Sequence, residues 1–362
     1  MSSSPELALD SNTALRVRNL TAAAAVVGLS CAIYALAPYN RAQMDGPFGA
    51  AVFLFSGRAF LFSAAGLYVL LLAAYYLAAA HSEPSKSLRF FALAVDFLRA
   101  PVTAVRRGVS PADRLALLAT LLKIFFGPFM AMALMQHVLG LLGNGWAILT
   151  GQDAGLGLLA LFNRHGFWFA MQLILFFDVA FFTAGYLVEM PKLGNEIRSV
   201  DPTWLGWMAA LLCYPPFNSI TAAIIGSTVS DFPQFDSPLA HIALNLMLLL
   251  LMALYASASV ALGLKASNLT HRGIVACGPY ALVRHPAYVA KNMAWWIASI
   301  PLVSSALAHS IVAGLTAMAS VLGWSLIYVL RAVTEEDHLR SVDGAYAAYA
   351  AKVRYRFIPG LL

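Results

Sequence analysis

Long runs of apolar residues are the feature that most constrains how this chain can fold. About 20 apolar residues suffice for a helix to cross a bilayer. In the hydrocarbon core only helices and closed barrels satisfy the backbone polar groups, and a barrel would show alternating segments of about ten residues. We therefore expect about eight spanning helices, at residues 19–37, 52–80, 115–142, 166–189, 204–226, 239–264, 286–304 and 307–330.

Composition supports the same conclusion. Hydrophobic residues make up 60% of the 362 residues and charged residues 11%, whereas soluble domains carry about 25% charged residues. The chain has too few polar side chains to cover a soluble surface. The sequence thus predicts an all-α fold, a polytopic integral membrane helical bundle.

The distribution of positive charge predicts how the bundle is oriented. The net charge is +6, and most of the 23 Lys and Arg residues lie before the first span, in every second loop, or after the last span. By the positive-inside rule both the N- and C-termini are then cytoplasmic. The segment at about 86–106 mixes basic and apolar residues, which favours an amphipathic helix lying in the membrane interface.

The same charge pattern indicates anionic lipid rather than nucleic acid as the partner. With no sorting signal recognised, we expect a bacterial inner membrane protein whose active site faces the cytoplasm. Cys31, Cys213 and Cys277 lie far apart and form no CxxC, so no metal site is predicted. The sequence predicts no particular oligomeric state.

Polarity divides the chain into two regions. Residues 1–238 hold five spans and the interfacial segment, and residues 239–362 hold three spans with a polar loop, 265–285, and a polar tail, 331–362. The loop and the tail flank a helical hairpin, 286–330, whose two ends return to the same side of the membrane. They should therefore meet at the cytoplasmic face, where we expect the functional site.

The tail has helical features of its own. Thr334 followed by Asp337 is typical of a capping box, which predicts that a new helix begins there. Tyr346, Tyr349, Val353 and Phe357 then recur at helical spacing up to Pro359-Gly360, so one aromatic face can pack on the bundle.

The loop and the tail together could bind S-adenosylmethionine, a sulfonium cation with an amino-acid tail. Its ammonium needs a carboxylate, its carboxylate needs a cation or backbone donors, and its adenine needs an aromatic or apolar slot. In that order the candidates are Glu335 or Glu336, Arg284 or His285, and Tyr280 or Tyr288. Each of these has a simpler explanation when taken alone, as a headgroup anchor or part of a helix N-terminal turn. Their joint occurrence favours a site.

The order and spacing of these residues resemble a known family. Gly278-Pro279-Tyr280, Arg284-His285-Pro286-x-Tyr288, Glu335-Glu336 and the closing Tyr346-x-x-Tyr349…Val353-x-x-Arg356-x-Ile358-Pro359-Gly360 run are similar to the isoprenylcysteine carboxyl methyltransferase and phospholipid methyltransferase family. The resemblance covers about residues 260–362.

The resemblance implies an S-adenosylmethionine pocket without a Rossmann domain, and a membrane lipid or other lipophilic substrate. It implies that Arg284 and Arg331 act on an anionic acceptor as catalytic residues. It implies cofactor binding by Tyr280, His285, Pro286, Tyr288, Glu335 and Glu336.

The sequence departs from the family at two points. Ala290 stands where the family usually has Gly, and Lys291-Asn292 follow inside an otherwise apolar span, where an ammonium is costly unless it faces a cavity or a partner. We expect Lys291, Asn292 and Arg356 to contact substrate. About 260 additional residues precede the matching region, and both departures disfavour a prenylated protein as acceptor. Whether oxygen, nitrogen or sulfur is methylated stays open.

Two alternatives remain. Sterol reductases that use NADPH end in a similar Tyr-Arg-x-x-Pro-Gly tail, although Pro286 and the paired glutamates favour the methyltransferase. A transporter could use Asp178 and the fifth span, which Pro215-Pro216 should break. Asp178, Arg58 and Lys123 all lie within spans, and we expect them to pair with one another or to face a cavity.

Overall fold

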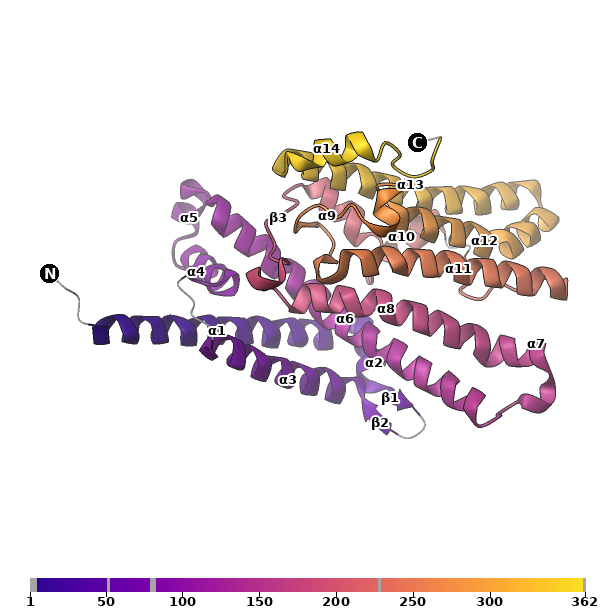
Figure 1. Ribbon diagram of the computed structural model, residues 1–362, viewed down its shortest axis with the longest axis horizontal. Coiled ribbons are helices and arrows are strands. Elements are labelled where there is room, and N and C mark those ends of the chain that lie inside the picture. The colour runs from indigo at the N-terminus through magenta and orange to yellow at the C-terminus, as the bar shows by residue number, and fades with distance from the viewer. Residues whose placement is uncertain (1–4, 51–52, 79–82, 227–228, 361–362) are drawn as a thin grey trace. The chain divides into compact units, whose positions relative to one another are not determined.

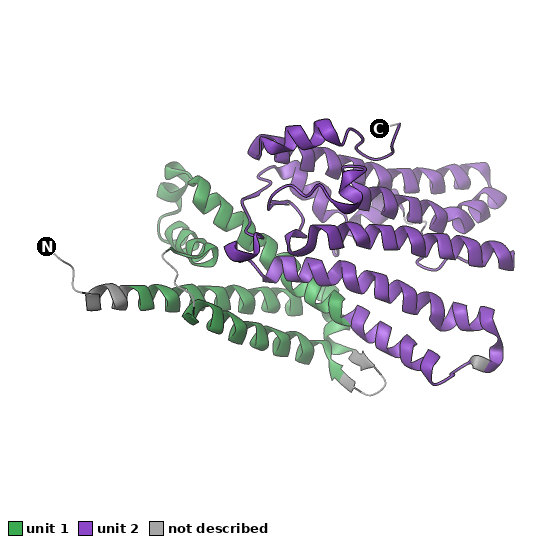
Figure 2. Cartoon of the chain, in the orientation of Figure 1, with its two compact units in different colours: residues 1–135 green, residues 136–362 purple. Residues whose placement is uncertain are grey.

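The computed structural model describes residues 5–50, 53–78, 83–226 and 229–360, and these are mostly helical (Figure 1). The chain separates into two compact units, residues 1–135 and 136–362 (Figure 2). Packing defines this boundary, which falls inside one long helix, whereas the division at residue 238 was drawn from polarity and stays a prediction. The two ends of the expected span 52–80, at 52 and 79–80, lie outside the described residues.

Among the described residues, six helices are long and apolar enough to cross a membrane. They cover Asn12–Leu36, Gly57–Ala78, Pro111–Leu149, Leu158–Leu187, Pro238–Lys265 and Ile311–Val342. The prediction of a helical integral membrane protein is confirmed.

Two of the eight expected spans, 204–226 and 286–304, are not among these six helices. The segment 204–226 forms two short helices, α9 (Trp204–Leu211) and α10 (Phe217–Ile225), on either side of the double proline. The break predicted there is present. Helix α12 (Pro286–His309) has 24 residues but is not among the six, and it carries the polar pair Lys291-Asn292 in its second turn.

The first unit is built on its longest helices, and α1 packs against both α3 and α4. A β-hairpin, β1 paired antiparallel with β2, precedes α3. The elements are α1 (Pro5–Leu36), α2 (Arg41–Asp45), β1 (Pro47–Ala50), β2 (Phe53–Ser56), α3 (Gly57–Ala78), α4 (Lys86–Arg99), α5 (Pro101–Arg107) and the first part of α6 (Pro111–Leu149).

Two features of this unit bear on the sequence predictions. Helices α4 and α5 cover the expected amphipathic segment and expose Phe97, Leu98 and Val102, but their place in the membrane interface stays a prediction. Arg58 pairs with Asp45 at 2.8 Å. This ion pair joins two residues of the first unit, and the expected pairing of Arg58 with Asp178 stays a prediction.

The second unit has a core of packed long helices. Helix α11 contacts both α8 and α12, and α12 contacts α13. A short ladder pairs β3 with β4, aligning Ser199 with His271. The elements are the end of α6, α7 (Leu158–Leu161), α8 (Phe167–Leu187), β3 (Ser199–Val200), α9, α10, α11 (Pro238–Leu262), β4 (Thr270–His271), α12, α13 (Ile311–Val342) and α14 (Ala345–Lys352).

Helix α13 is continuous past the point where a new helix was expected. It runs to Val342, and the Thr334 hydroxyl donates to the backbone oxygens of Leu330 and Arg331 within the same helix. The capping-box prediction is wrong, since no helix begins at Thr334. The polar residues after Leu330 continue α13 as far as Val342. The aromatic spacing of the tail is confirmed for Tyr346, Tyr349 and Val353, which are buried together, whereas Phe357 lies beyond the end of α14 at Lys352.

The polar loop 265–285 is fixed at both ends. At its start, Gly185 of α8 lies so close to the Ala266 backbone that a side chain at position 185 would collide with it. At its end, the Arg284 and His285 amides donate to the Tyr355 and Arg356 oxygens, each at 3.0 Å. The loop and the tail thus meet beside the hairpin, as its geometry predicts.

Candidate functional site

A cavity of about 190 Å³ lies in the second unit, where the polar loop meets α8, α11, α12, α13 and the tail. A single water needs only about 10–15 Å³, so this space can hold a ligand. The predicted site residues that line it are Tyr280, Arg284, His285, Tyr288, Lys291, Arg331 and Glu335, whereas Pro286, Asn292, Glu336 and Arg356 do not.

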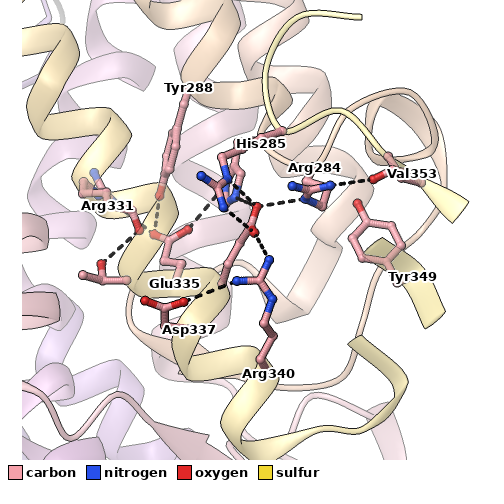
Figure 3. A network of polar contacts seen from close by, with 12 residues as sticks. Arg284, His285, Tyr288, Arg331, Glu335, Asp337, Arg340, Tyr349 and Val353 are labelled. Carbon is pink, nitrogen blue, oxygen red and sulfur yellow. Dashed lines mark hydrogen bonds and ion pairs between the residues drawn. The ribbon is translucent and has the colours of Figure 1, made fainter. Parts of the chain in front are cut away.

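Glu335 presents its carboxylate to this cavity. Its side chain is 27% exposed, and the Tyr288 hydroxyl donates to Oε1. The nearest basic side chains are more distant, with Arg331 Nη2 at 3.7 Å from Oε1 and His285 Nδ1 at 3.8 Å from Oε2. Figure 3 shows Glu335 with Tyr288, Arg331 and His285 around it. The carboxylate therefore keeps acceptor capacity for a ligand.

Arg331 is buried beside Glu335, between aromatic rings. Its side chain is 4% exposed, Nη2 donates to Asn268 Oδ1 at 3.0 Å, and the guanidinium lies 5.0 Å from the Tyr288 ring and 5.3 Å from the Tyr328 ring. Cation–π contacts of this kind are strongest away from water. Among the described residues Nε has no hydrogen-bond partner, so one donor is left for a ligand or a water.

Glu336 faces a different environment, since consecutive residues of an α-helix point about 100° apart. It is fully buried and accepts from four side chains. The donors are Arg284 Nε at 2.9 Å, His285 Nε2 at 3.1 Å, Arg340 Nη2 at 2.6 Å, and Arg356 through Nε and Nη2, each at 3.0 Å. Both oxygens are thus occupied by the protein itself. We call this group, which Figure 3 also shows, the Glu336 cluster.

The other donors of Arg284 hold the tail. Its Nη1 donates to the backbone oxygens of Val353 at 2.9 Å and Arg354 at 2.6 Å, so little of its guanidinium remains for an acceptor. The hydrogen bonds from Arg356 to the Glu336 carboxylate raise the pKa of Arg356. The Glu336 cluster therefore ties the tail to the polar loop and to α13.

The remaining predicted residues have local contacts. Pro286 is buried in the first turn of α12, where a proline costs no hydrogen bond. Asn292 Nδ2 donates to the Tyr288 backbone oxygen at 2.8 Å, and its Oδ1 has no partner among the described residues. The Tyr349 hydroxyl donates to the Tyr280 backbone oxygen at 2.9 Å. Burial raises the pKa of Tyr349 to about 12 and that of Tyr280 further, so neither is a base near neutral pH.

The part of the cavity farther from the polar loop, which we call its inner end, is lined by residues of the long helices α11, α12 and α13. Lys291 Nζ stands over three aromatic rings, 5.4 Å from Tyr255, 5.3 Å from Trp295 and 5.7 Å from Tyr328. The Tyr255 hydroxyl donates to Asp178 at 3.0 Å, and Ser259 donates to the other Asp178 oxygen. Asp178 thus belongs to the surroundings of this cavity.

Several lining residues were missed by sequence reasoning. Asn268, Tyr214, Tyr255 and Tyr328 come from separate elements and follow no spacing that marks a site. Tyr214 precedes the Pro215-Pro216 break, which was the one signal near it. The described residues contain no group of three or more His, Cys, Asp or Glu placed to hold a metal ion.

Comparison with known proteins gives one match. A family model described as "Protein of unknown function (DUF1295)" matches residues 217–353, which include most of the cavity lining. That family is distantly related to membrane proteins of the steroid 5-alpha reductase and methyltransferase type. Neither a curated protein nor a solved structure matches the chain.

Proposed function

We propose that this protein is an integral membrane methyltransferase that uses S-adenosylmethionine to methylate a lipid-soluble or membrane-bound acceptor. The observation that carries the proposal is a single cavity that joins a reachable carboxylate, Glu335, to aromatic rings and buried cations. S-Adenosylmethionine supplies the activated methyl group. The residues of the chain bind, orient and exclude water, since the transfer itself is an in-line displacement.

The lining fits the parts of this cofactor. Glu335 offers a carboxylate to an ammonium, with the Tyr288 hydroxyl fixing its position. Tyr280 and Tyr288 offer rings against which adenine can pack. Arg331 is a buried cation in the same wall. A zwitterionic ligand with an aromatic base therefore finds partners for each of its parts.

The inner end suits an acceptor that arrives through the bilayer. Lys291, Tyr255 and Tyr328 lie on α12, α11 and α13, within or beside the spanning segments. Polar residues at that depth are costly unless they serve a cavity or each other. We propose that the acceptor enters from the membrane and the cofactor from the side of the loop and tail, which charge asymmetry assigns to the cytoplasm.

A reductase that uses NADPH is the second candidate, because the matched family is distantly related to both steroid 5-alpha reductases and methyltransferases. Such an enzyme would use the same cavity for a dinucleotide. The transporter alternative has weaker support, since Asp178 and the broken span border this cavity rather than a separate pathway.

The test is calorimetric titration of the purified protein with S-adenosylmethionine, S-adenosylhomocysteine and NADPH. We expect saturable binding of the first two. In Glu335→Gln their affinity should fall about tenfold to a hundredfold, the loss typical of a hydrogen bond to a charged group. Binding of NADPH alone would move the protein to the reductases, and binding of none of the three would overturn both enzyme candidates.

A further inference from the structure

The corner of the cavity around Gly273 gathers positive charge that the site described above does not use. Gly273 and its neighbour Arg272 line the cavity, as does Lys265. The β3–β4 ladder brings Arg198 to the same place, since the Arg198 amide donates to the His271 backbone oxygen at 2.9 Å. Lys265 and Arg198 therefore lie at the same end of the cavity, which Arg272 also lines.

Arg272 is the buried member of this corner. Only 2% of the residue is exposed, and its Nη1 donates to the Asn195 backbone oxygen at 2.7 Å. Among the described residues its Nε and Nη2 have no hydrogen-bond partner. Leaving charged donors buried and unpaired is unfavourable, and an anion bound there would offset that penalty.

Lys265 and Arg198 converge over Gly273. A Cβ built on Gly273 would lie 3.3 Å from Lys265 Nζ and 3.6 Å from the Arg198 guanidinium carbon. Gly273 has φ +98°, a conformation that favours glycine. The absent side chain thus leaves space where two cations approach the same point.

The acidic groups near this corner have other partners. Asp343 pairs with His271 at 3.0 Å, Asp201 accepts from Thr203, and Glu189 accepts from the Ile197 amide. The Glu189 carboxylate acts on the charge of Arg272, and Asp343 acts on His271 beside Lys265 and Arg198. What the described residues of the corner lack is a carboxylate ion-paired to Lys265 or Arg198.

We propose that Lys265, Arg272 and Arg198 form an oxyanion-binding corner that takes the acidic group of the ligand in this cavity. The identity of the ligand rests on the proposed function. If the ligand is S-adenosylmethionine, the acidic group is the carboxylate of its amino-acid tail. The two candidates from sequence for that group are already engaged, Arg284 by Glu336 and the tail backbone and His285 by Glu336. A nucleotide phosphate has the same chemistry and is the alternative source.

Pairs of ligands that differ only in the acidic group test this directly. S-Adenosylhomocysteine carries the amino-acid tail and 5′-methylthioadenosine lacks it, while NADPH carries the 2′-phosphate and NADH lacks it. Each is titrated into wild type, Lys265→Met and Arg198→Met. Arg272→Met is added where it folds, because that side chain is buried. Lys192→Met removes an exposed lysine outside the cavity lining and serves as the matched control.

We expect Lys265→Met to weaken S-adenosylhomocysteine about tenfold or more, as for a lost charged contact, and to leave 5′-methylthioadenosine within twofold. If Lys265→Met instead weakened the binding of NADPH and left that of NADH unchanged, the result would support the anion-binding corner and overturn the proposed methyltransferase function. Equal effects on both members of a pair, or none, would overturn the corner. If wild type binds none of these ligands, inorganic phosphate must raise its melting temperature and not that of Lys265→Met, and failure there would also overturn the corner.

Discussion

Glu335 and Glu336 are neighbours in the chain, yet they stand in opposite environments. Glu336 is fully buried and its oxygens are taken by Arg284, His285, Arg340 and Arg356. Glu335 is partly exposed to the cavity and receives one close donor, from Tyr288. A carboxylate that the protein has already neutralised holds structure together, whereas one left partly free can bind a ligand.

The largest expected effect separates these two roles. Glu336→Gln leaves three arginines without their shared carboxylate, and breaking a buried ion pair costs about 3–5 kcal/mol. We expect a clear fall in melting temperature and release of the tail, detected by limited proteolysis after residue 342. Glu335→Gln is the matched control and should melt close to wild type. Equal melting of the two variants would abolish the distinction between them.

A smaller effect is expected on the cavity side. Tyr288→Phe keeps the ring against Arg331 and removes the hydroxyl that Glu335 accepts. One hydrogen bond contributes about 0.5–1.5 kcal/mol, so the affinity for S-adenosylhomocysteine should fall a few-fold with little change in melting temperature. Calorimetry beside a thermal melt checks both. A large loss of stability without a change in affinity would place Tyr288 with the structural residues.

The rim of the Glu336 cluster should matter less than its centre. Arg340 donates to Glu336 at 2.6 Å, but its side chain is 44% exposed. Exposed ion pairs contribute about 0.2–1 kcal/mol. Arg340→Ala should therefore lower stability far less than Glu336→Gln, as measured by denaturant or thermal unfolding. A comparable loss would show that the cluster depends on its outer cation.

The smallest expected effect is a dependence on pH. Burial lowers the pKa of His271 and outweighs the Asp343 carboxylate, which acts in the opposite direction. Above the unfolded pKa of about 6.5 the imidazole is neutral in both states; below it the unfolded chain binds the proton more readily, so folding stability falls. Melting temperatures at pH 8 and pH 5.5 should differ less in His271→Gln than in wild type.

The sequence predicted the meeting of loop and tail because a helical hairpin returns both ends to one side. It could not distinguish Glu335 from Glu336, since the choice depends on how α13 is rotated against its neighbours. It also placed a helix start at Thr334, where buried partners for Arg331 and Glu336 instead let the helix continue. Asn268 and Tyr255 were missed because their role arises only when separate spans pack together.

The most direct test of the central claim is photo-crosslinking of methyl-labelled S-adenosylmethionine to the purified protein, followed by peptide mapping. The account predicts label on peptides from residues 278–291 or 328–339, the two sides of the cavity wall, with labelling blocked by S-adenosylhomocysteine and lost in Glu335→Gln. Specific label confined to residues 1–135, or labelling unchanged in Glu335→Gln, would contradict it.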